Sequence, residues 1–452
     1  MDSPSTVRKF FGTDGVRGPY GGPVINERFA YRLGAAAGRW LISRGTVNAL
    51  VVIGRDTRAS GESLTRALAA GLSAQGVQPC DLGILPTPAV ARAVVTERAA
   101  LGVVVTASHN SAADNGIKFF GAHGVKLTDA DELQIESWLR DEALPTDFQL
   151  APLAARPAIG AYVAAMAALL PPRALAGWRI VLDTAHGATA MTSPLVLRAL
   201  GAEVIGIGDA PDGMNINADV GSEHPEQLAA RVMATGAQLG IAHDGDGDRC
   251  VLCDETGSIL DGDEILTVLA THAQGKGALQ ANTLVVTVQS NLGVDAALAA
   301  LGGRVLRTAV GDRYVIEKMR AAGATLGGES SGHIICADIS PTGDGLVAAL
   351  KVIAVMLATS QPLSELRKVL KKFPQVSATL KVREKRALNS LTALAAAIRA
   401  LETELGAAGR VLVRYSGTEP KLRFLVEGRD LTQVRAGLDR IVAVARTELE
   451  VP

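Results

Sequence analysis

Three aspartates separated by single glycines form the sharpest chemical pattern in this chain. They are Asp244, Asp246 and Asp248, in the segment HDGDGDR at 243–249. Glycine lets the backbone turn tightly enough for three carboxylates to converge on one hard cation. Carboxylates this close repel one another, and a divalent ion removes that repulsion. Their oxygens leave positions for phosphate or water in the octahedron that Mg²⁺ prefers, so the segment predicts a magnesium site.

A calcium-binding helix-loop-helix is the competing interpretation of these aspartates, with Glu255 at its twelfth position. That loop needs glycine at its sixth position, where this chain has Arg249. The flanking runs LGIA and CVLC are apolar and strand-like, whereas a calcium loop joins two helices. The same runs argue against a solvated acidic loop, because they place the aspartates at a strand edge inside the fold.

Ser108 lies where a strand-like run enters a polar turn, in VVVTASHNSAADNGIKFF at 103–120. Open α/β sheets place their chemistry at the carboxyl ends of strands. A serine there can carry a phosphoryl group, and Lys118 in the next strand-like run can supply or accept the proton. Alone, Ser108 and His109 are more typical of an ordinary turn, and the G-x-S-x-G elbow of Ser-His-Asp hydrolases is missing.

Two further loops carry groups that suit a sugar phosphate. In GGESSGH at 327–333, the spacing of Glu329 and Ser331 points both side chains the same way in an extended loop, so that they can bind neighbouring sugar hydroxyls. A turn with a solvated glutamate is the equally weighted alternative. In FFGTDGVRG at 10–18, Arg17 can neutralise a phosphoryl group.

The segment RYSGTEPKLR at 414–423 predicts a phosphate anchor. Hydroxyls, backbone N–H groups and two guanidinium groups can surround a phosphate there, and guanidinium matches phosphate bidentately. The residues concerned are Arg414, Ser416, Gly417, Thr418 and Arg423. A hairpin with surface arginines is the alternative. From spacing alone we expect no chemical role for Asp312 and Arg313 in TAVGDRYV.

The elements that must position these residues alternate between β-branched runs and Ala/Leu-rich helical patterns. This alternation predicts an α/β fold with mixed, mostly parallel sheets. Seams at EALPTDFQLAPLAARPA, after Cys253 and at KKFPQ divide the chain. We expect three similar α/β domains and a smaller C-terminal α+β domain, at residues 1–150, 151–254, 255–370 and 371–452.

Composition excludes several classes of protein. Hydrophobic residues make up 48% of the 452 residues and charged residues 20%, which excludes a mainly disordered chain. A formal net charge of -1 without long runs of one sign predicts no nucleic-acid or membrane-surface partner. No signal peptide or transmembrane stretch is recognised, so we expect a cytoplasmic protein. The cysteines are interpreted as small buried hydrophobic residues, including the C-x-x-C of Cys250 and Cys253.

Taken together, the motifs resemble the alpha-D-phosphohexomutase superfamily, and most closely its bacterial branch that acts on glucosamine phosphates. FFGTDGVRG, TASHN, DNGIKFF, DGDGDR, VGDRYV, GGESSGH, FPQV and RYSGTEP occur in the family's order along nearly the whole chain. The resemblance implies four domains around a central cleft, a bound Mg²⁺ cofactor and a sugar-phosphate substrate. It also implies a glucosamine or glucose 1,6-bisphosphate intermediate or activator, and a homodimer.

The resemblance also implies a role for each motif residue. Ser108 would be the phosphoserine and, with Asp244, Asp246 and Asp248, a metal ligand. Lys118 would be the general acid/base, with His109 and Arg249 lining the phosphoserine site. The substrate would be bound by Arg17, Glu329, Ser331, His333, Arg414, Ser416, Gly417, Thr418 and Arg423.

The chain departs from the family's pattern in three places. Ser111 stands where proline is usual, so the family pattern does not account for the rigidity of the serine loop. Tyr415 replaces a small residue or proline, and GMNINADVGSEHPE mixes features of several branches. Mannose and glucose phosphates therefore remain alternative substrates, and a non-catalytic sugar-phosphate binding protein remains an alternative of another class.

Overall fold

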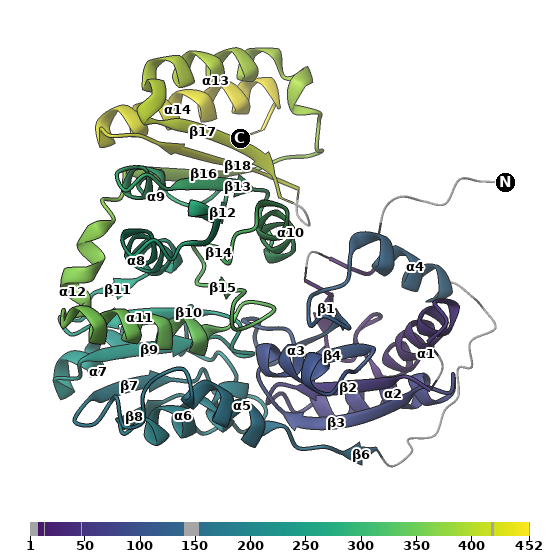
Figure 1. Ribbon diagram of the computed structural model, residues 1–452. Helices are drawn as coiled ribbons and strands as arrows, with labels where there is room; N and C mark the ends of the chain where they lie inside the picture. The colour runs from purple at the N-terminus through teal and green to yellow at the C-terminus, as the bar shows by residue number, and fades with distance from the viewer. Residues whose placement is uncertain (1–7, 13, 47, 140–152, 417–419, 452) are drawn as a thin grey trace. The chain divides into compact units, whose positions relative to one another are not determined.

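The computed structural model describes residues 8–12, 14–46, 48–139, 153–416 and 420–451. The chain forms two compact units. The larger consists of residues 1–289 and 302–369, and the smaller of residues 290–301 and 370–452. Figure 1 labels their helices and strands along the chain.

The first sheet of the larger unit carries the N-terminal glycine-rich loop and the serine loop. Its strand order is β1-β5-β4-β2-β3-β6, with parallel pairing among β2, β3, β4 and β6 and antiparallel pairing of β5 with β1 and β4. The strands are β1 (Val16–Pro19), β2 (Leu50–Arg55), β3 (Gln78–Ile84), β4 (Leu101–Val105), β5 (Asp114–Gly121) and β6 (Ala154–Ala155). The helices are α1 (Glu27–Ser43), α2 (Gly61–Ser73), α3 (Thr87–Thr96) and α4 (Asp129–Leu139). Every residue of β4 is buried, as expected for a parallel strand covered on both faces.

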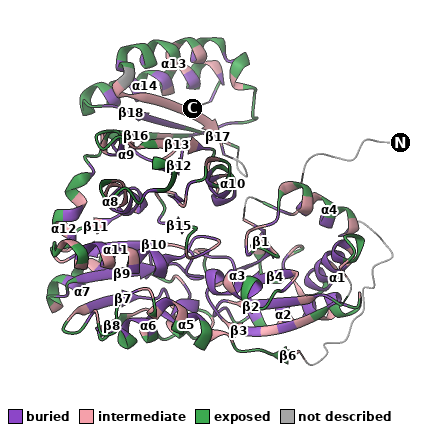
Figure 2. Cartoon of the chain, viewed as in Figure 1, coloured by how far each residue is buried: buried purple, intermediate pink, exposed green. Residues whose placement is uncertain are grey.

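The second sheet carries the aspartate loop between two antiparallel strands. Its order is β11-β10-β9-β7-β8, and β7 runs parallel to both β8 and β9. The strands are β7 (Arg179–Asp183), β8 (Glu203–Ile207), β9 (Leu239–His243), β10 (Cys250–Asp254) and β11 (Ile259–Leu260). Its helical segments are α5 (Ile159–Ala167), η1 (Ala188–Met191), α6 (Ser193–Ala199) and α7 (Glu226–Thr235). Figure 2 shows β9 and β10 buried, so the loop between them starts and ends in the core.

The third sheet carries the GGESSGH loop between β14 and β15. Its order is β13-β12-β14-β15, with only the last pair antiparallel. The strands are β12 (Thr283–Thr287), β13 (Arg304–Thr308), β14 (Leu326–Gly328) and β15 (Ile334–Cys336). The helical segments are α8 (Gly262–Gly275), η2 (Gln280–Asn282), α10 (Asp312–Ala322), α11 (Gly345–Thr359), α12 (Leu363–Leu366) and η3 (Arg367–Val369). Helix α11 contacts β9, β10, β15 and α8, so it lies between the second and third sheets (Figure 1).

The smaller unit is an α+β structure. An antiparallel sheet of order β16-β18-β17 packs against two long helices, and α9 belongs to the same unit. The elements are α9 (Gly293–Ala299), β16 (Gln375–Lys381), η4 (Leu388–Ser390), α13 (Thr392–Leu405), η5 (Gly406–Ala408), β17 (Arg410–Tyr415), β18 (Lys421–Glu427) and α14 (Leu431–Glu448). Its apolar core centres on Leu422, Phe424 and Val426 of β18.

These sheets confirm the predicted α/β class with mixed, mostly parallel sheets and a C-terminal α+β part. All four cysteines are buried as free thiols, and burial raises the pKa of Cys253 to about 12, so the C-x-x-C is packing rather than redox chemistry. In the described part of the chain no single helix is long and apolar enough to cross a membrane. Residues 345–359 and 363–369 reach that length only as a pair bent by 94°.

Candidate active site

Ser108 lies just beyond the carboxyl end of β4 and reaches the aspartate loop of the second sheet. Its hydroxyl Oγ donates a hydrogen bond of 2.6 Å to Asp244 Oδ2. Its backbone N–H donates to the Thr106 hydroxyl at 2.9 Å, and its φ angle of 52° is in the left-handed region. The side chain is buried, at 1% exposure. Segments separated by 136 residues in sequence therefore meet at one hydroxyl and one carboxylate.

The three aspartates form a compact buried cluster. Each of Asp244, Asp246 and Asp248 offers a carboxylate oxygen, and these oxygens all lie within 4.8 Å of one another. Among the described residues, Asp246 Oδ1 is buried and has no hydrogen-bond partner, and Asp248 Oδ1 makes no hydrogen bond but lies 3.5 Å from His333 Nδ1. A buried carboxylate oxygen without a donor is costly, and a hard divalent cation would satisfy it. The cluster therefore fits the metal site predicted from the sequence.

The charges around the cluster shift the pKa values of Asp244 and Asp248 in opposite directions. Burial and the charges of Asp248 and Asp246 raise the pKa of Asp244 well above its ordinary value. Burial acts in the same direction on Asp248, but Lys118 and His333 outweigh it and hold the pKa of Asp248 well below its ordinary value. Asp244, which faces the serine, is thus the carboxylate that most needs a further positive charge.

Lys118 projects from β5 into the same cluster. It is 1% exposed, and its Nζ lies 2.9 Å from Asp246 Oδ2 and 3.5 Å from Asp248 Oδ2. A third carboxylate, Asp14 Oδ2, lies 3.1 Å from the same nitrogen. A lysine ammonium has three N–H donors, so these contacts fix its position beside the metal site.

A second buried lysine extends this network and was not recognised from the sequence. Lys126 forms ion pairs with Asp14 and, at 2.7 Å, with Asp312 Oδ2. His333 lies between Asp312 and Asp248, with each ring nitrogen 3.5 Å from a carboxylate oxygen. Burial lowers the pKa of His333, but Asp248 and Asp312 outweigh it, so the pKa is raised. Asp312, for which we expected no role, is thus part of a ring of buried charges that returns to the aspartate cluster.

Arg313, the neighbour of Asp312, also has an ionic role that its spacing did not reveal. Its guanidinium pairs with Glu132 at 2.6 Å and with Asp129, both in α4. Arg8 binds the same two carboxylates, at 2.5 Å and 2.9 Å. Arg313 therefore ties the start of α10 to α4, and Arg8 ties the N-terminal segment to the same two acids of α4.

His109, Arg249 and Arg17 are gathered around the serine. His109 Nδ1 lies 3.4 Å from Ser108 Oγ, and burial together with Arg249 and Arg17 lowers the pKa of His109 to about 4. Arg249 pairs with Glu223 at 3.3 Å, and Arg17 pairs with Asp14. Two guanidinium groups next to an uncharged histidine give this side of the serine a positive potential suited to phosphate.

Glu329 and Ser331 are not joined to the aspartate cluster by a direct contact among the described residues. Glu329 Oε1 accepts a hydrogen bond of 2.9 Å from the backbone N–H of Gly311, and Ser331 is exposed. The loop is tied to the aspartate segment through its backbone, because Cys250 N donates to Gly332 O at 3.0 Å. Both side chains thus belong to a loop whose backbone is hydrogen-bonded to the segment that carries the proposed metal ligands.

In the smaller unit, Arg414 and Arg423 are opposite each other on β17 and β18. Burial and the Arg423 charge lower the pKa of Arg414, as expected where two cations lie side by side. Ser416 is buried, and its N–H donates to Lys421 O at 2.8 Å. Gly417 and Thr418 lie outside the described residues.

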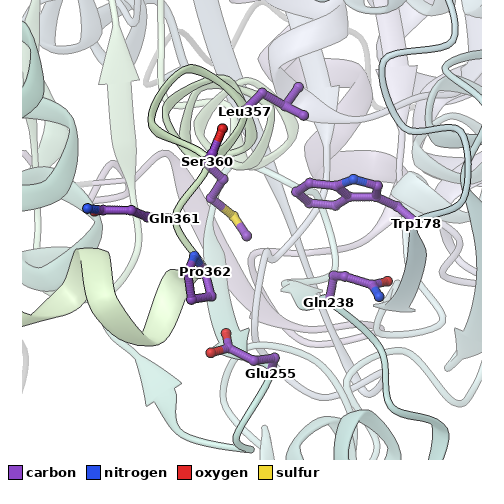
Figure 3. A pocket seen from close by; sticks show the side chains of 8 residues that line it. Trp178, Gln238, Glu255, Leu357, Ser360, Gln361 and Pro362 are labelled. Carbon is purple, nitrogen blue, oxygen red and sulfur yellow. The ribbon is translucent and has the colours of Figure 1, made fainter.

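A separate pocket of about 310 Å³ lies at the opposite ends of the strands (Figure 3). Trp178 and Gln238 line it from the residues that precede β7 and β9, whereas Asp244 follows the carboxyl end of β9. Two of its polar side chains already have partners within the protein: Gln238 accepts from Arg179 N at 2.7 Å, and Glu255 accepts from the Ser364 hydroxyl. We therefore assign the pocket no part in the chemistry.

Comparison with known proteins agrees with this arrangement. Profiles described as phosphoglucomutase/phosphomannomutase alpha/beta/alpha domains I, II and III match residues 8–145, 161–257 and 261–373, and the profile of the C-terminal domain matches residues 353–444. The chain is 50% identical to a phosphoglucosamine mutase of Thioalkalivibrio sulfidiphilus, over 97% of this chain and 98% of the relative. It is 44% identical to a phosphoglucosamine mutase of Pelobacter propionicus, over 98% and 99% of the two chains.

Solved structures show the same fold. A phosphoglucomutase/phosphomannomutase family protein of Burkholderia thailandensis superposes with a TM-score of 0.81 at 24% identity, covering 96% of this chain and 97% of that chain. A putative phosphomannomutase of Thermus thermophilus gives 0.79 at 25% identity, covering 99% and 100%. The chain belongs to the phosphoglucomutase/phosphomannomutase family of the alpha-D-phosphohexomutase superfamily.

Proposed function

We propose that the chain is a phosphoglucosamine mutase, which interconverts glucosamine 6-phosphate and glucosamine 1-phosphate. The hydrogen bond between Ser108 and Asp244 carries the proposal, because it joins a nucleophilic hydroxyl to a carboxylate cluster suited to a metal. The identity of 44–50% to relatives named phosphoglucosamine mutase supports the choice of sugar.

In the proposed reaction a phosphoryl group is carried by Ser108. The bond between phosphorus and Ser108 Oγ breaks, and a bond forms from phosphorus to a sugar hydroxyl, giving a 1,6-bisphosphate. The sugar hydroxyl loses a proton and Ser108 gains one, so the transfer is proton-neutral. The bisphosphate then reverses its orientation in the site. Its other phosphate is transferred to Ser108 by the reverse exchange, and the isomeric monophosphate leaves.

The residues around Ser108 have distinct proposed roles in this exchange. Asp244, Asp246 and Asp248 would hold Mg²⁺, which supplies positive charge to the phosphoryl oxygens when it is bound. Lys118 is the proposed general acid/base, since its ammonium is already fixed beside the carboxylates. His109, Arg249 and Arg17 would stabilise the phosphoserine.

The substrate is proposed to be held by the other loops. Glu329 and Ser331 would bind the sugar hydroxyls. His333 belongs to the same loop, but it is buried and both of its ring nitrogens face carboxylates, so it would support the substrate site from behind. Arg414, Ser416 and Arg423, with Gly417 and Thr418, would bind the phosphate that is not reacting. Two neighbouring guanidinium groups provide the bidentate donors that this requires.

The test is a side-by-side assay of glucosamine, glucose and mannose 6-phosphates, with glucose 1,6-bisphosphate as activator. We expect the highest kcat/KM for glucosamine 6-phosphate, and intact-mass analysis should show one phosphate on the wild type and none on Ser108→Ala. A preference for glucose or mannose would overturn the choice of sugar. Absence of both turnover and bound phosphate would overturn the mutase assignment and leave a binding protein.

A further inference from the structure

The backbone of the serine loop is held by two side chains that converge on the same carbonyl groups. Arg58 donates from its terminal nitrogen to Ser108 O at 3.1 Å and to Asn110 O at 2.7 Å. Asn217 donates from its amide nitrogen to the same two oxygens, each at 2.9 Å. We call these two residues the carbonyl clamp. Ser108 is thereby gripped on its carbonyl while its hydroxyl faces Asp244.

The serine loop needs such a clamp because its backbone is not favourable by itself. Ser108 has a φ of 52°, a left-handed conformation that is disfavoured for residues with a Cβ. Arg58 also binds the far end of this loop, since its other terminal nitrogen donates to Ser111 O and, at 2.8 Å, to Asp114 O.

Each member of the clamp is itself fixed in place. The Arg58 side chain is 0% exposed and pairs with Asp56 at 2.9 Å, and Asp56 also accepts from the Thr106 hydroxyl at 2.7 Å. Asn217 has a φ of 59°, and its N–H donates to Ala185 O at 2.8 Å, just after β7. Asparagine tolerates this left-handed conformation better than most residues.

The segments that carry Arg58 and Asn217 are also bound to each other. The N–H of Ala59 donates to Gly213 O at 2.9 Å, and the Thr57 hydroxyl donates to His186 O at 2.6 Å. The two residues of the clamp are therefore carried by segments of the first and second sheets that are bound to each other. Asn217 belongs to the GMNINADVGSEHPE segment, to which the proposed reaction gives no other role.

We propose that Asn217 is a positioning residue for the phosphoryl-carrying serine, acting together with Arg58 through the Ser108 and Asn110 carbonyls. This inference rests on the proposed mutase function. Its consequence is that the segment around residue 217 controls the rate of phosphoryl transfer without touching the sugar. Sub-ångström placement of a nucleophile strongly affects rate, whereas substrate affinity depends on other loops.

The test compares Asn217→Gly with Asn217→Asp and a matched control, Asn215→Ala. Glycine keeps the left-handed backbone without strain and removes both donors, and aspartate keeps the shape but cannot donate. Asn215 lies in the same segment, and its amide binds only Ala210 O and the Asp212 N–H among the hydrogen bonds of the described residues. Its loss should therefore leave turnover unchanged.

For both Asn217 variants we expect kcat to fall by about tenfold or more, with KM for glucosamine 6-phosphate within about twofold of wild type. The rate at which glucose 1,6-bisphosphate phosphorylates Ser108, followed by intact mass, should fall in parallel. Full kcat in Asn217→Gly, or an equal loss in Asn215→Ala, would overturn the inference. If the wild type itself neither turns over nor accepts phosphate, the proposed function fails instead.

Discussion

Replacing Asp344 by asparagine should change how the stability of the larger unit depends on pH. Asp344 is 2% exposed and caps α11, with Oδ1 accepting from Leu346 N at 3.1 Å and Val347 N at 3.0 Å. Tyr162 donates its hydroxyl to Asp344 Oδ2 at 2.9 Å. The next residue, Gly345, donates its N–H to Gly247 O in the aspartate loop at 3.1 Å, so this cap supports the site.

Burial is the main reason that the pKa of Asp344 is raised, from 3.8 to about 6, against the hydrogen bonds from Val347 and Tyr162. A carboxyl group with a higher pKa in the folded protein binds its proton more tightly there than in the unfolded chain. Its contribution is fully present below pH 3.8 and is lost as the pH rises through about 6. At 1.36 kcal/mol for each pKa unit, the change across this window is about 3 kcal/mol.

Asparagine keeps a capping oxygen and has no proton to lose, so Asp344→Asn should lack this pH dependence. The free energy of unfolding of wild type minus variant should therefore fall by about 2 kcal/mol between pH 4 and pH 7, the rest of the change lying below pH 4. Urea unfolding followed by tryptophan fluorescence suits the measurement, because Trp40, Trp138 and Trp178 all lie in the larger unit. Asp338→Asn is the control, since the ion pair of Asp338 within the described ranges is a largely exposed one with Lys351.

A difference that stays constant within about 0.5 kcal/mol over this pH range would refute the reasoning, because a buried carboxyl that titrates must leave a slope. A difference that grows with pH would refute it more directly. That result would mean that ionised Asp344 stabilises the cap, as in an ordinary N-cap aspartate near the helix dipole.

Three further changes test the site. Asp246→Asn should weaken Mg²⁺ binding by roughly tenfold or more in calorimetry, since it removes one of three anionic ligands; unchanged affinity would contradict the metal assignment. Ser108→Ala should abolish turnover yet keep the unfolding free energy within about 1 kcal/mol, the worth of one hydrogen bond. Lys126→Met should destabilise the larger unit by about 3 kcal/mol in urea, because Asp14 and Asp312 lose a buried cation; an unaffected unfolding midpoint would show that the ring of buried charges contributes little.

The sequence predicted those parts of the site that depend on local pattern. Glycines between aspartates, a serine after an apolar run and a lysine in the next strand are all visible in short segments, because each requires a particular neighbour in the chain. The α/β class follows from the same kind of periodicity. The distance between the serine and the aspartates could only be inferred from the family's motif order, and the structure supplies it.

The residues that support the site from outside the motifs could not be predicted, because their partners are set by tertiary packing. Asp14 and Lys126 are isolated charges in their own segments, and only tertiary packing brings them to each other and to their distant partners Lys118 and Asp312. Arg58 and Asn217 bind backbone carbonyl groups, which every residue has, so their targets leave no mark in the sequence. Arg313 binds side-chain carboxylates, but its partners in α4 lie far away in the chain, so only the fold reveals the pairing.

The alternation of glycine and aspartate illustrates how one pattern can satisfy two different constraints. Gly247 has a φ of 73°, so the left-handed turn itself favours glycine there. Gly245 is needed for space: a Cβ on it would lie 2.7 Å from Ser108 O and 2.8 Å from the Asn217 amide nitrogen. The aspartate loop can therefore approach the serine because Gly245 has no side chain at the point of contact. The serine carbonyl at this point is the one that the clamp holds. Gly247→Ala should act through backbone strain of about 1–2 kcal/mol and through a clash with Thr189, because a Cβ on Gly247 would lie 2.4 Å from Thr189 Cγ2. Gly245→Ala should instead separate Ser108 from Asp244 and slow phosphorylation of the serine, although no ligand is changed.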